Sequence, residues 1–196
     1  TVVVSFKGTN GSAPLARLQL GSDGNYYGTT STGGSANKGT AFKLTPTGTL
    51  TSFNFSGANG ASPESGLVES SGFLYGTARL GGAKNKGAIF KIPIGGGTPV
   101  LVASFTGANG ANPVAAVTKG SDGNFYGTTS TGGTANKGAI YKLVGSTITK
   151  LFDFNGTNGQ TPESTLIPVS ATTLAFYGTA SAGGSGLKGT VFKFTP

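Results

Sequence analysis

The chain has 196 residues, of which 36 are glycine, 10% are charged and 10% are aromatic, and its formal net charge is +8. The low charge content excludes a coiled coil, and the aromatic content argues against disorder because the chain can bury enough apolar surface to offset its ordering entropy. Cysteine is absent, which excludes disulfides and thiolate chemistry, and no apolar run approaches the roughly 18 residues of a membrane helix, so we expect no membrane span in this segment.

Short apolar bursts separated by Gly, Asn, Asp and Pro indicate an all-β chain with many turns. The first burst, residues 1–6, is expected to be a strand. Four more strands should follow, joined by Asp-Gly and Pro-x-Gly turns, because Gly supplies a positive φ and Pro presets a negative one. These strands are predicted around 15–20 and at 26–31, 40–44 and 50–55.

The same pattern then recurs through the rest of the chain, in units of about 49 residues. Each unit carries a Tyr-Gly-Thr motif, a glycine pair six residues after the Tyr, a Lys-Gly pair and a Phe four residues before an Asn-Gly pair. The units lie at approximately 1–49, 50–99, 100–148 and 149–196, and we expect them to form a single domain.

Units of this length with four strands are typical of propeller blades. The sequence therefore predicts a four-bladed β-propeller of four-stranded antiparallel blades. The chain ends in Thr195-Pro196, which matches Thr45-Pro46 just before a fourth strand. Residues 1–6 match that fourth strand, so we expect this N-terminal strand to close the last blade and remove an open edge.

The segments 22–44 and 121–143 share the pattern S-D-G-N-[FY]-Y-G-T-T-S, a glycine pair, and N-K-G-[TA]-x-[FY]-K-L. This pattern resembles the Gloeo/Verruco (GloVer) tandem repeat of exported bacterial proteins, which is often coupled to cell-surface sorting anchors. The resemblance covers all four units and implies an extracellular, propeller-like protein of the cell surface. It implies no catalytic residues. Units 2 and 4 depart from the pattern at Ser70-Ser71-Gly72 and Ala171-Thr172-Thr173, which argues against a metal ring that includes Asp23 and Asp122.

The chain has few residues suited to catalysis. Histidine is absent, so general acid–base work would depend on the six acidic residues. Asp23 and Asp122 are interpreted as turn residues. Glu64 and Glu163 share a Pro-Glu-Ser slot in units 2 and 4, and this two-fold alternation could place them opposite each other. We favour solvated residues over a catalytic pair, and we expect no catalytic residue, no metal site and no cofactor.

The basic residues suggest a different kind of site. The repeated lysines spread the positive charge around the chain, which argues against nucleic acid as a partner because nucleic-acid readers concentrate charge on one face. One lysine of each unit lies at a loop-to-strand junction, and these four should cluster at one end of the ring. They are candidate binding residues for an acidic polysaccharide or a neighbouring subunit: Lys38, Lys86, Lys137 and Lys188. Sequons make Asn10, Asn54 and Asn155 candidate glycosylation sites, although most bacterial sequons are unused.

Three functions remain open from the sequence. The first is a non-enzymatic extracellular structural or adhesive repeat protein, which self-associates into a filament or matrix through strand or face contacts. Two chains pairing into an eight-bladed ring is another form of self-association. The alternative is a carbohydrate-binding, lectin-like propeller with a polysaccharide partner. The third is an enzyme that uses Glu64 and Glu163. We rank them in that order, and all place the chain outside the cell or on its surface.

Overall fold

The computed structural model describes residues 1–196, which form strands, turns and connecting segments without a helix. No helix is therefore present that could cross a membrane. The strands belong to four sheets, which we call blades 1 to 4. Blade 1 contains β1 (Gln19–Leu20), β2 (Tyr26–Thr30), β3 (Thr40–Leu44) and β4 (Leu50–Asn54). Blade 2 contains β5 (Val68–Ser70), β6 (Phe73–Ala78), β7 (Ala88–Pro93) and β8 (Val100–Ser104). Blade 3 contains β9 (Thr118–Lys119), β10 (Phe125–Thr129), β11 (Ala139–Val144) and β12 (Thr147–Asp153). Blade 4 contains β13 (Ile167–Pro168), β14 (Phe176–Ala180) and β15 (Thr190–Phe194).

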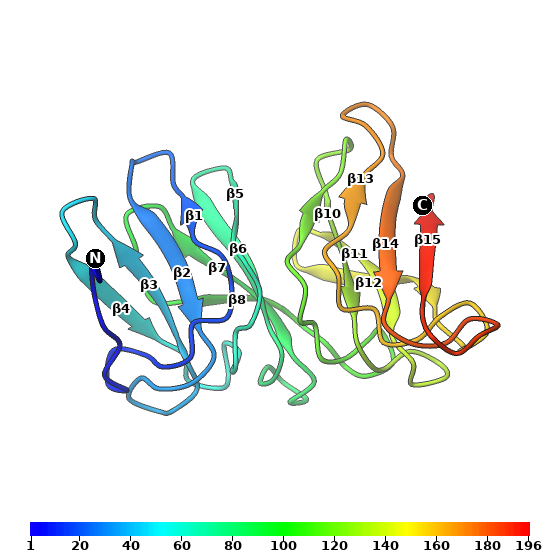
Figure 1. Cartoon of the computed structure of the whole chain (residues 1–196), viewed down its shortest axis with the longest axis horizontal. Helices are drawn as coiled ribbons and strands as arrows, with labels where there is room; N and C mark the ends of the chain where they lie inside the picture. The colour runs from blue at the N-terminus through cyan, green and yellow to red at the C-terminus, as the bar shows by residue number, and fades with distance from the viewer.

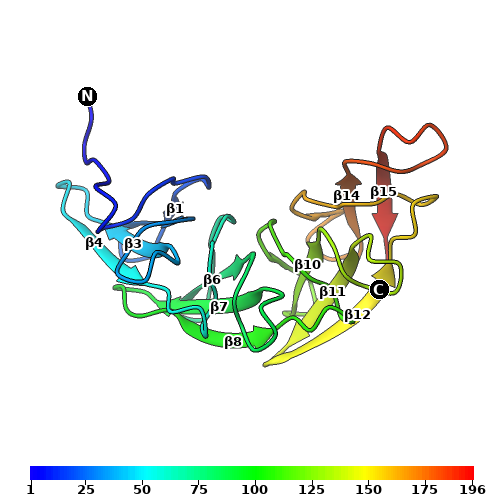
Figure 2. The same cartoon turned by 90° about the horizontal axis from the view of Figure 1, so that it is seen from below.

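Each blade is an antiparallel meander whose strands pair in chain order. The four blades stand side by side along an open arc, with blades 1 and 4 at its two ends (Figures 1 and 2). The outermost strands β4, β8 and β12 lie on the convex side of this arc (Figure 2). Sheets arranged in this radial way are propeller blades, so the predicted all-β propeller architecture is confirmed.

One detail of the predicted closure is wrong. Blade 4 has only three strands, and residues 1–6 form no strand. They lie beside blade 1, far from β15 (Figure 2), and the Phe6 ring packs on Phe42 with centroids 5.2 Å apart. The physical reason is curvature: each blade junction turns the chain by a modest angle, so four blades leave the two ends of the arc apart. The predicted first strand, 15–20, is also longer than β1, because only Gln19 and Leu20 pair with β2.

The hydrophobic core lies at the junctions between neighbouring blades. Three clusters of buried residues fill the junctions of blades 1 and 2, 2 and 3, and 3 and 4. At each junction the Phe that follows the outer strand packs edge-on against an aromatic ring of the next blade. The first of these pairs, Phe55 and Phe90, has centroids 4.8 Å apart. Each blade therefore depends on its neighbours for burial, as expected for a repeat protein.

A glycine in the second strand of each blade makes room for that aromatic ring. In blade 1, a Cβ on Gly28 would lie 2.9 Å from Cε1 of Phe42 and 3.1 Å from Cδ2 of Leu18. In blade 3 the ring belongs to Tyr141, and its hydroxyl is the atom nearest the equivalent glycine, Gly127. The hydroxyl takes the space that a leucine methyl group fills in the other blades, because blade 3 carries the smaller Val117 at the leucine position.

Candidate functional site

The main hollow of the molecule is a cleft of about 530 Å³ on the concave side of the arc. All four blades contribute to it, through the segments that lead into their innermost strands. Its apolar lining consists of aliphatic side chains, including Val68, Val114 and Ile167, and no aromatic ring lines it. We call this hollow the inner cleft. Its volume lies within the range of ordinary ligand pockets, about 300–1,000 Å³.

Four charged side chains line the inner cleft, one from each blade: Arg17, Glu64, Lys119 and Glu163. Glu64 Oε1 lies 3.6 Å from Nη1 of Arg79 in the same blade. Lys119 Nζ donates a hydrogen bond of 3.1 Å to Ser70 Oγ. Arg17 and Glu163 have no ion-pair partner within the chain. The cleft thus holds two cations without a carboxylate partner and one unpaired carboxylate.

The two glutamates singled out from the sequence both reach this cleft, from blades 2 and 4. They are not equivalent, because Glu64 is half-buried and ion-paired while Glu163 is exposed and unpaired. General acid–base catalysis requires a side chain that is held within hydrogen-bond reach of the proton it transfers. The structure brings both carboxyl groups to one hollow, where Arg79 holds Glu64 and no ion-pair partner orients Glu163.

The loop lysines Lys38, Lys86, Lys137 and Lys188 lie outside the inner cleft. Their backbone has a structural role at the blade junctions: the Ser62 N–H donates a hydrogen bond of 3.0 Å to the Lys38 carbonyl, and the equivalent bonds tie Lys86 and Lys137 to the blade that follows. Lys188 belongs to the last blade and makes no such bond. Ligand binding by these lysine side chains stays a prediction.

Asp122 occupies a tight turn, as predicted, and it also anchors its blade. It accepts hydrogen bonds from Asn124 N at 3.2 Å and Tyr126 Oη at 3.0 Å, and it lies 2.9 Å from Lys142 Nζ. Burial opposes ionisation of this carboxyl, but the hydrogen bonds from Lys142, Asn124 and Tyr126 hold its pKa well below the ordinary value. These contacts make the aspartate part of the blade framework.

Asp23 plays the same part in blade 1. It accepts a hydrogen bond of 2.7 Å from Tyr27 Oη, which in turn accepts one of 2.7 Å from Gly95 N in blade 2. Burial and the bond to Asp23 raise the pKa of Tyr27 to about 12. The tyrosine therefore stays protonated and links two blades.

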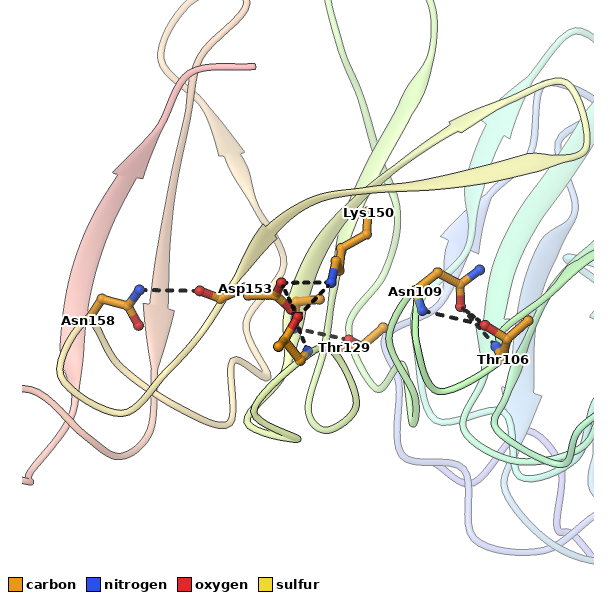
Figure 3. A network of polar contacts seen from close by, with 8 residues as sticks. Thr106, Asn109, Thr129, Lys150, Asp153 and Asn158 are labelled. Atoms are coloured by element: carbon orange, nitrogen blue, oxygen red, sulfur yellow. Dashed lines mark hydrogen bonds and ion pairs between the residues drawn. The ribbon is translucent and has the colours of Figure 1, made fainter.

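Asp153 is likewise engaged in structure. Its carboxylate lies 2.7 Å from Lys150 Nζ and accepts a 2.9 Å bond from Thr134 N, while Asn158 Nδ2 donates to its backbone carbonyl at 3.2 Å (Figure 3). In the same view, Asn109 Oδ1 accepts a 2.8 Å bond from the N–H of Thr106 and closes the Asn-Gly turn. No three side chains of the metal-binding types gather anywhere in the chain.

The three sequon asparagines differ in their surroundings. Asn54 and Asn155 are exposed, whereas Asn10 is half-buried. Asn10 Oδ1 accepts a 2.7 Å bond from Lys7 N, and its Nδ2, the atom a glycan would modify, donates to Ser5 O at 3.4 Å. Glycosylation of these residues stays a prediction.

Residues 95–196, more than half of the chain, match the Gloeobacter/Verrucomicrobia repeat family. The chain belongs to this family. No curated protein matches the sequence.

Several solved structures resemble this Gloeobacter/Verrucomicrobia repeat protein, and they are β-propeller proteins. A streptogramin B lyase matches with 16% identity and a TM-score of 0.53, over 95% of this chain and 56% of that one. Virginiamycin B lyase from Staphylococcus aureus gives 15% and 0.52, over 91% and 54%. A TolB homologue from Agrobacterium tumefaciens gives 14% and 0.55, over 91% and 57%. At these identities the likeness concerns the fold alone, and the chain spans little more than half the length of each neighbour.

Sequence reasoning missed two of the cleft residues, Arg17 and Lys119. Each occupies a position at which the four repeats differ completely: Arg17 corresponds to Gly66, Ala116 and Thr165. Repeated landmark residues identify the units, whereas residues that vary between units carry no such mark. Variation between repeats next to a constant Pro and a constantly apolar position is the signal that could have identified them.

Proposed function

We propose that this repeat protein is a non-enzymatic structural and adhesive module of the bacterial cell surface, which assembles head to tail with further copies of itself. One observation supports this proposal above the others. The two ends of the arc expose the same two faces that are buried against each other at the three inner junctions.

The face that each blade turns toward the next blade, its forward face, is apolar. One position in the third strand of each blade lies on this face, and its side chain is buried in the first three blades: Ala41 and Ile89 are 0% exposed and Ile140 is 1% exposed. The equivalent Val191 of blade 4 is 78% exposed. Tyr177, on the second strand of the same blade, is 46% exposed. Blade 4 therefore presents an apolar face without a covering blade.

Blade 1 exposes the opposite face. Leu18 is 48% exposed, although its equivalents Leu67, Val117 and Leu166 are each 1% exposed where they meet the preceding blade. A single contact, between blade 1 of one copy and blade 4 of another, would cover both Leu18 and Val191. A second copy of the chain, placed with its blade 1 against blade 4 of the first, satisfies both faces at once.

In this assembly, residues 1–6 of the second copy supply the strand that blade 4 of the first copy lacks. Their segment Val3-Val4-Ser5-Phe6 matches Val102-Ala103-Ser104-Phe105 at the end of β8. Val2 and Val3 are 78% and 66% exposed, and the outer edge of β15 is unpaired. An unpaired edge readily accepts an added strand. The Phe6 ring already lies on Phe42 of blade 1, as Phe55 lies on Phe90, so the segment is set to lead from a preceding blade.

This contact is heterologous, since a different surface is used on each partner. It yields a ring when the rotation closes and a filament when it does not. This chain covers 54–57% of the length of the similar propellers, so two copies, with eight blades, supply about the chain length of one such propeller.

The test is the mass of the protein in solution, measured by light scattering over a range of concentrations. We expect an oligomer for the natural chain and a monomer for Val191→Lys, because the variant places an ammonium group in the apolar contact. Val144→Lys is the matched control: Val144 is 50% exposed at the tip of blade 3, away from the end faces. A dimer indicates a ring and larger masses indicate a filament. A monomeric natural chain, or equal behaviour of the two variants, would overturn the proposal.

The inner cleft favours a second function, carbohydrate binding, because it gathers charged and hydroxyl-bearing side chains from all four blades. We propose no catalytic role for Glu64 and Glu163. The half-buried member of this pair is already held by Arg79. Hydrolase activity that disappears in both Glu64→Gln and Glu163→Gln would reverse this view.

A further inference from the structure

We infer that the inner cleft is a binding site for an acidic saccharide, held by Arg17 and Lys119 on opposite halves of the arc. The inference is independent of the head-to-tail assembly, since the cleft lies within one chain and includes no residue of segment 1–6.

The first observation concerns where the repeats differ. A proline and an apolar residue frame the same segment in every repeat, for example Pro14 and Leu18 in the first. The positions between and just after them carry the cleft residues, and those of Arg17 and Lys119 differ in all four repeats, whereas Glu64 and Glu163 share one. The position of Lys119 is occupied by Leu20, Glu69 and Pro168 in the other units. The positions that support the fold are thus similar in every repeat, while the positions of Arg17 and Lys119 on the concave surface differ. This is the pattern of a binding surface on a repeat scaffold.

The second observation concerns charge. Glu64 is neutralised by Arg79 at 3.6 Å, which leaves Arg17 and Lys119 against the single free carboxylate of Glu163. The chain as a whole carries +8. The field in the cleft therefore favours an anion, and a guanidinium that has no internal partner is suited to a carboxylate.

The third observation concerns the lining. Neutral sugars are commonly bound by stacking on aromatic rings, which bury the C–H face of the sugar. The inner cleft has only aliphatic side chains for this purpose, such as Val114 and Ile167. The hydroxyl group of Thr165 can exchange hydrogen bonds with sugar hydroxyls, whereas the buried hydroxyl of Thr118 already donates to Leu166 O at 2.6 Å. Affinity must then come from the charge on the ligand, which points to a uronate rather than a neutral saccharide.

The two cations of the inner cleft that have no carboxylate partner lie on different blades. Arg17 comes from blade 1 and Lys119 from blade 3. A ligand that contacts both must span the floor of the cleft, where Gly66 leaves Arg17 Cγ without a side chain beside it: a Cβ on Gly66 would lie 3.5 Å from that atom. An oligomer with a carboxylate on successive sugar units meets this requirement better than a single small anion.

The experiment is a calorimetric titration of the full chain with a trimer of α-1,4-linked galacturonate, alongside the uncharged trimer of α-1,4-linked galactose. We expect binding of the galacturonate trimer only. Arg17→Gln should weaken it about fivefold, from the loss of one solvent-accessible ionic contact. Glu163→Gln should strengthen it, because the unpaired carboxylate repels the ligand.

Lys84→Gln is the matched control, since it removes the same single positive charge from an exposed loop outside the cleft. We expect it to leave the affinity unchanged. Equal weakening by Lys84→Gln and Arg17→Gln would show that only the net charge matters, and equal binding of both trimers would exclude a role for the carboxylates. Either result, or no binding of the galacturonate trimer, overturns the inference. The same titration on Val191→Lys separates it from self-association, because the monomeric variant keeps the cleft intact.

Discussion

Replacing Tyr141 by phenylalanine is expected to stabilise this protein, although it removes a polar group from a natural sequence. The Tyr141 hydroxyl is fully buried and has no hydrogen-bond partner. Burial raises its pKa above the ordinary tyrosine value, so it stays protonated with its donor unsatisfied. The other blades carry phenylalanine at the same position: Phe42, Phe90 and Phe192.

The expected magnitude follows from two opposing contributions. An unsatisfied buried hydroxyl costs about 1–3 kcal/mol relative to a partnered or solvated one. Its removal leaves a void of one oxygen atom, which costs only a few tenths of a kcal/mol, at about 24 cal/mol per Å³. The net gain is about 1 kcal/mol, or a rise of about 2–4 °C in the melting temperature of a chain of this size. The double variant Tyr141→Phe/Val117→Leu should gain further, because the added methyl group fills the void as it does in the other three blades.

The assay is thermal and urea-induced unfolding, followed by circular dichroism and compared with Tyr126→Phe. The Tyr126 hydroxyl donates to Asp122 at 3.0 Å, so the same chemical change there should destabilise the protein by about 1 kcal/mol. The two variants must therefore move in opposite directions. If Tyr141→Phe lowers the melting temperature as Tyr126→Phe does, the hydroxyl has a partner and the reasoning from its burial is wrong.

Two further predictions concern the framework. Gly81→Ala should lower the free energy of unfolding by more than about 3 kcal/mol, because the new Cβ would lie 2.7 Å from Ala61 N at a φ of +78°. Gly72→Ala has a nearly equal φ of +77° but no neighbour within 4 Å, so it should cost about 1 kcal/mol. Urea unfolding of the two variants separates backbone strain from steric clash, and equal losses would contradict the steric argument. Asp122 has a folded-state pKa below its unfolded value near 3.8, so its contribution is fully present above about pH 4 and is lost as the pH falls toward the folded pKa. Unfolding at pH 7, pH 3 and pH 2 should show that the destabilising effect of Asp122→Asn shrinks progressively, with only part of it lost at pH 3 because the folded carboxyl is still ionised there. An effect independent of pH would mean that the ionised form is not what stabilises the blade.

The repeat pattern predicted most of the local structure correctly. The strand at 40–44 was placed at its observed bounds, and Asp23 and Asp122 were identified as turn residues. These features depend on local rules: Gly and Asn adopt positive φ values, and Asp binds backbone N–H groups two residues ahead. Similarly, the shared slot of Glu64 and Glu163 suggested that they could lie opposite each other, and both line the inner cleft because equivalent positions of a repeat face the same axis.

The candidate site was predicted less well, for a physical reason. A cleft is formed by positions that lie far apart in the sequence, and its charge depends on which partners are already engaged. The ion pair of Glu64 with Arg79 and the missing partner of Arg17 both depend on side-chain placement in three dimensions. The loop lysines stood out because they repeat, yet their backbone carbonyls tie one blade to the next.

The sequence by itself determined the number of units, the order of their strands and the glycines that admit the aromatic rings, since each of these follows from conformational and steric preferences within about 49 residues. Only the tertiary structure decided whether the ends of the chain meet. Closure depends on the angle between neighbouring blades, which is set by packing at three junctions and accumulates along the arc. That angle separates residues 1–6 from β15 and leaves Val191 exposed where Ile89 and Ile140 are buried.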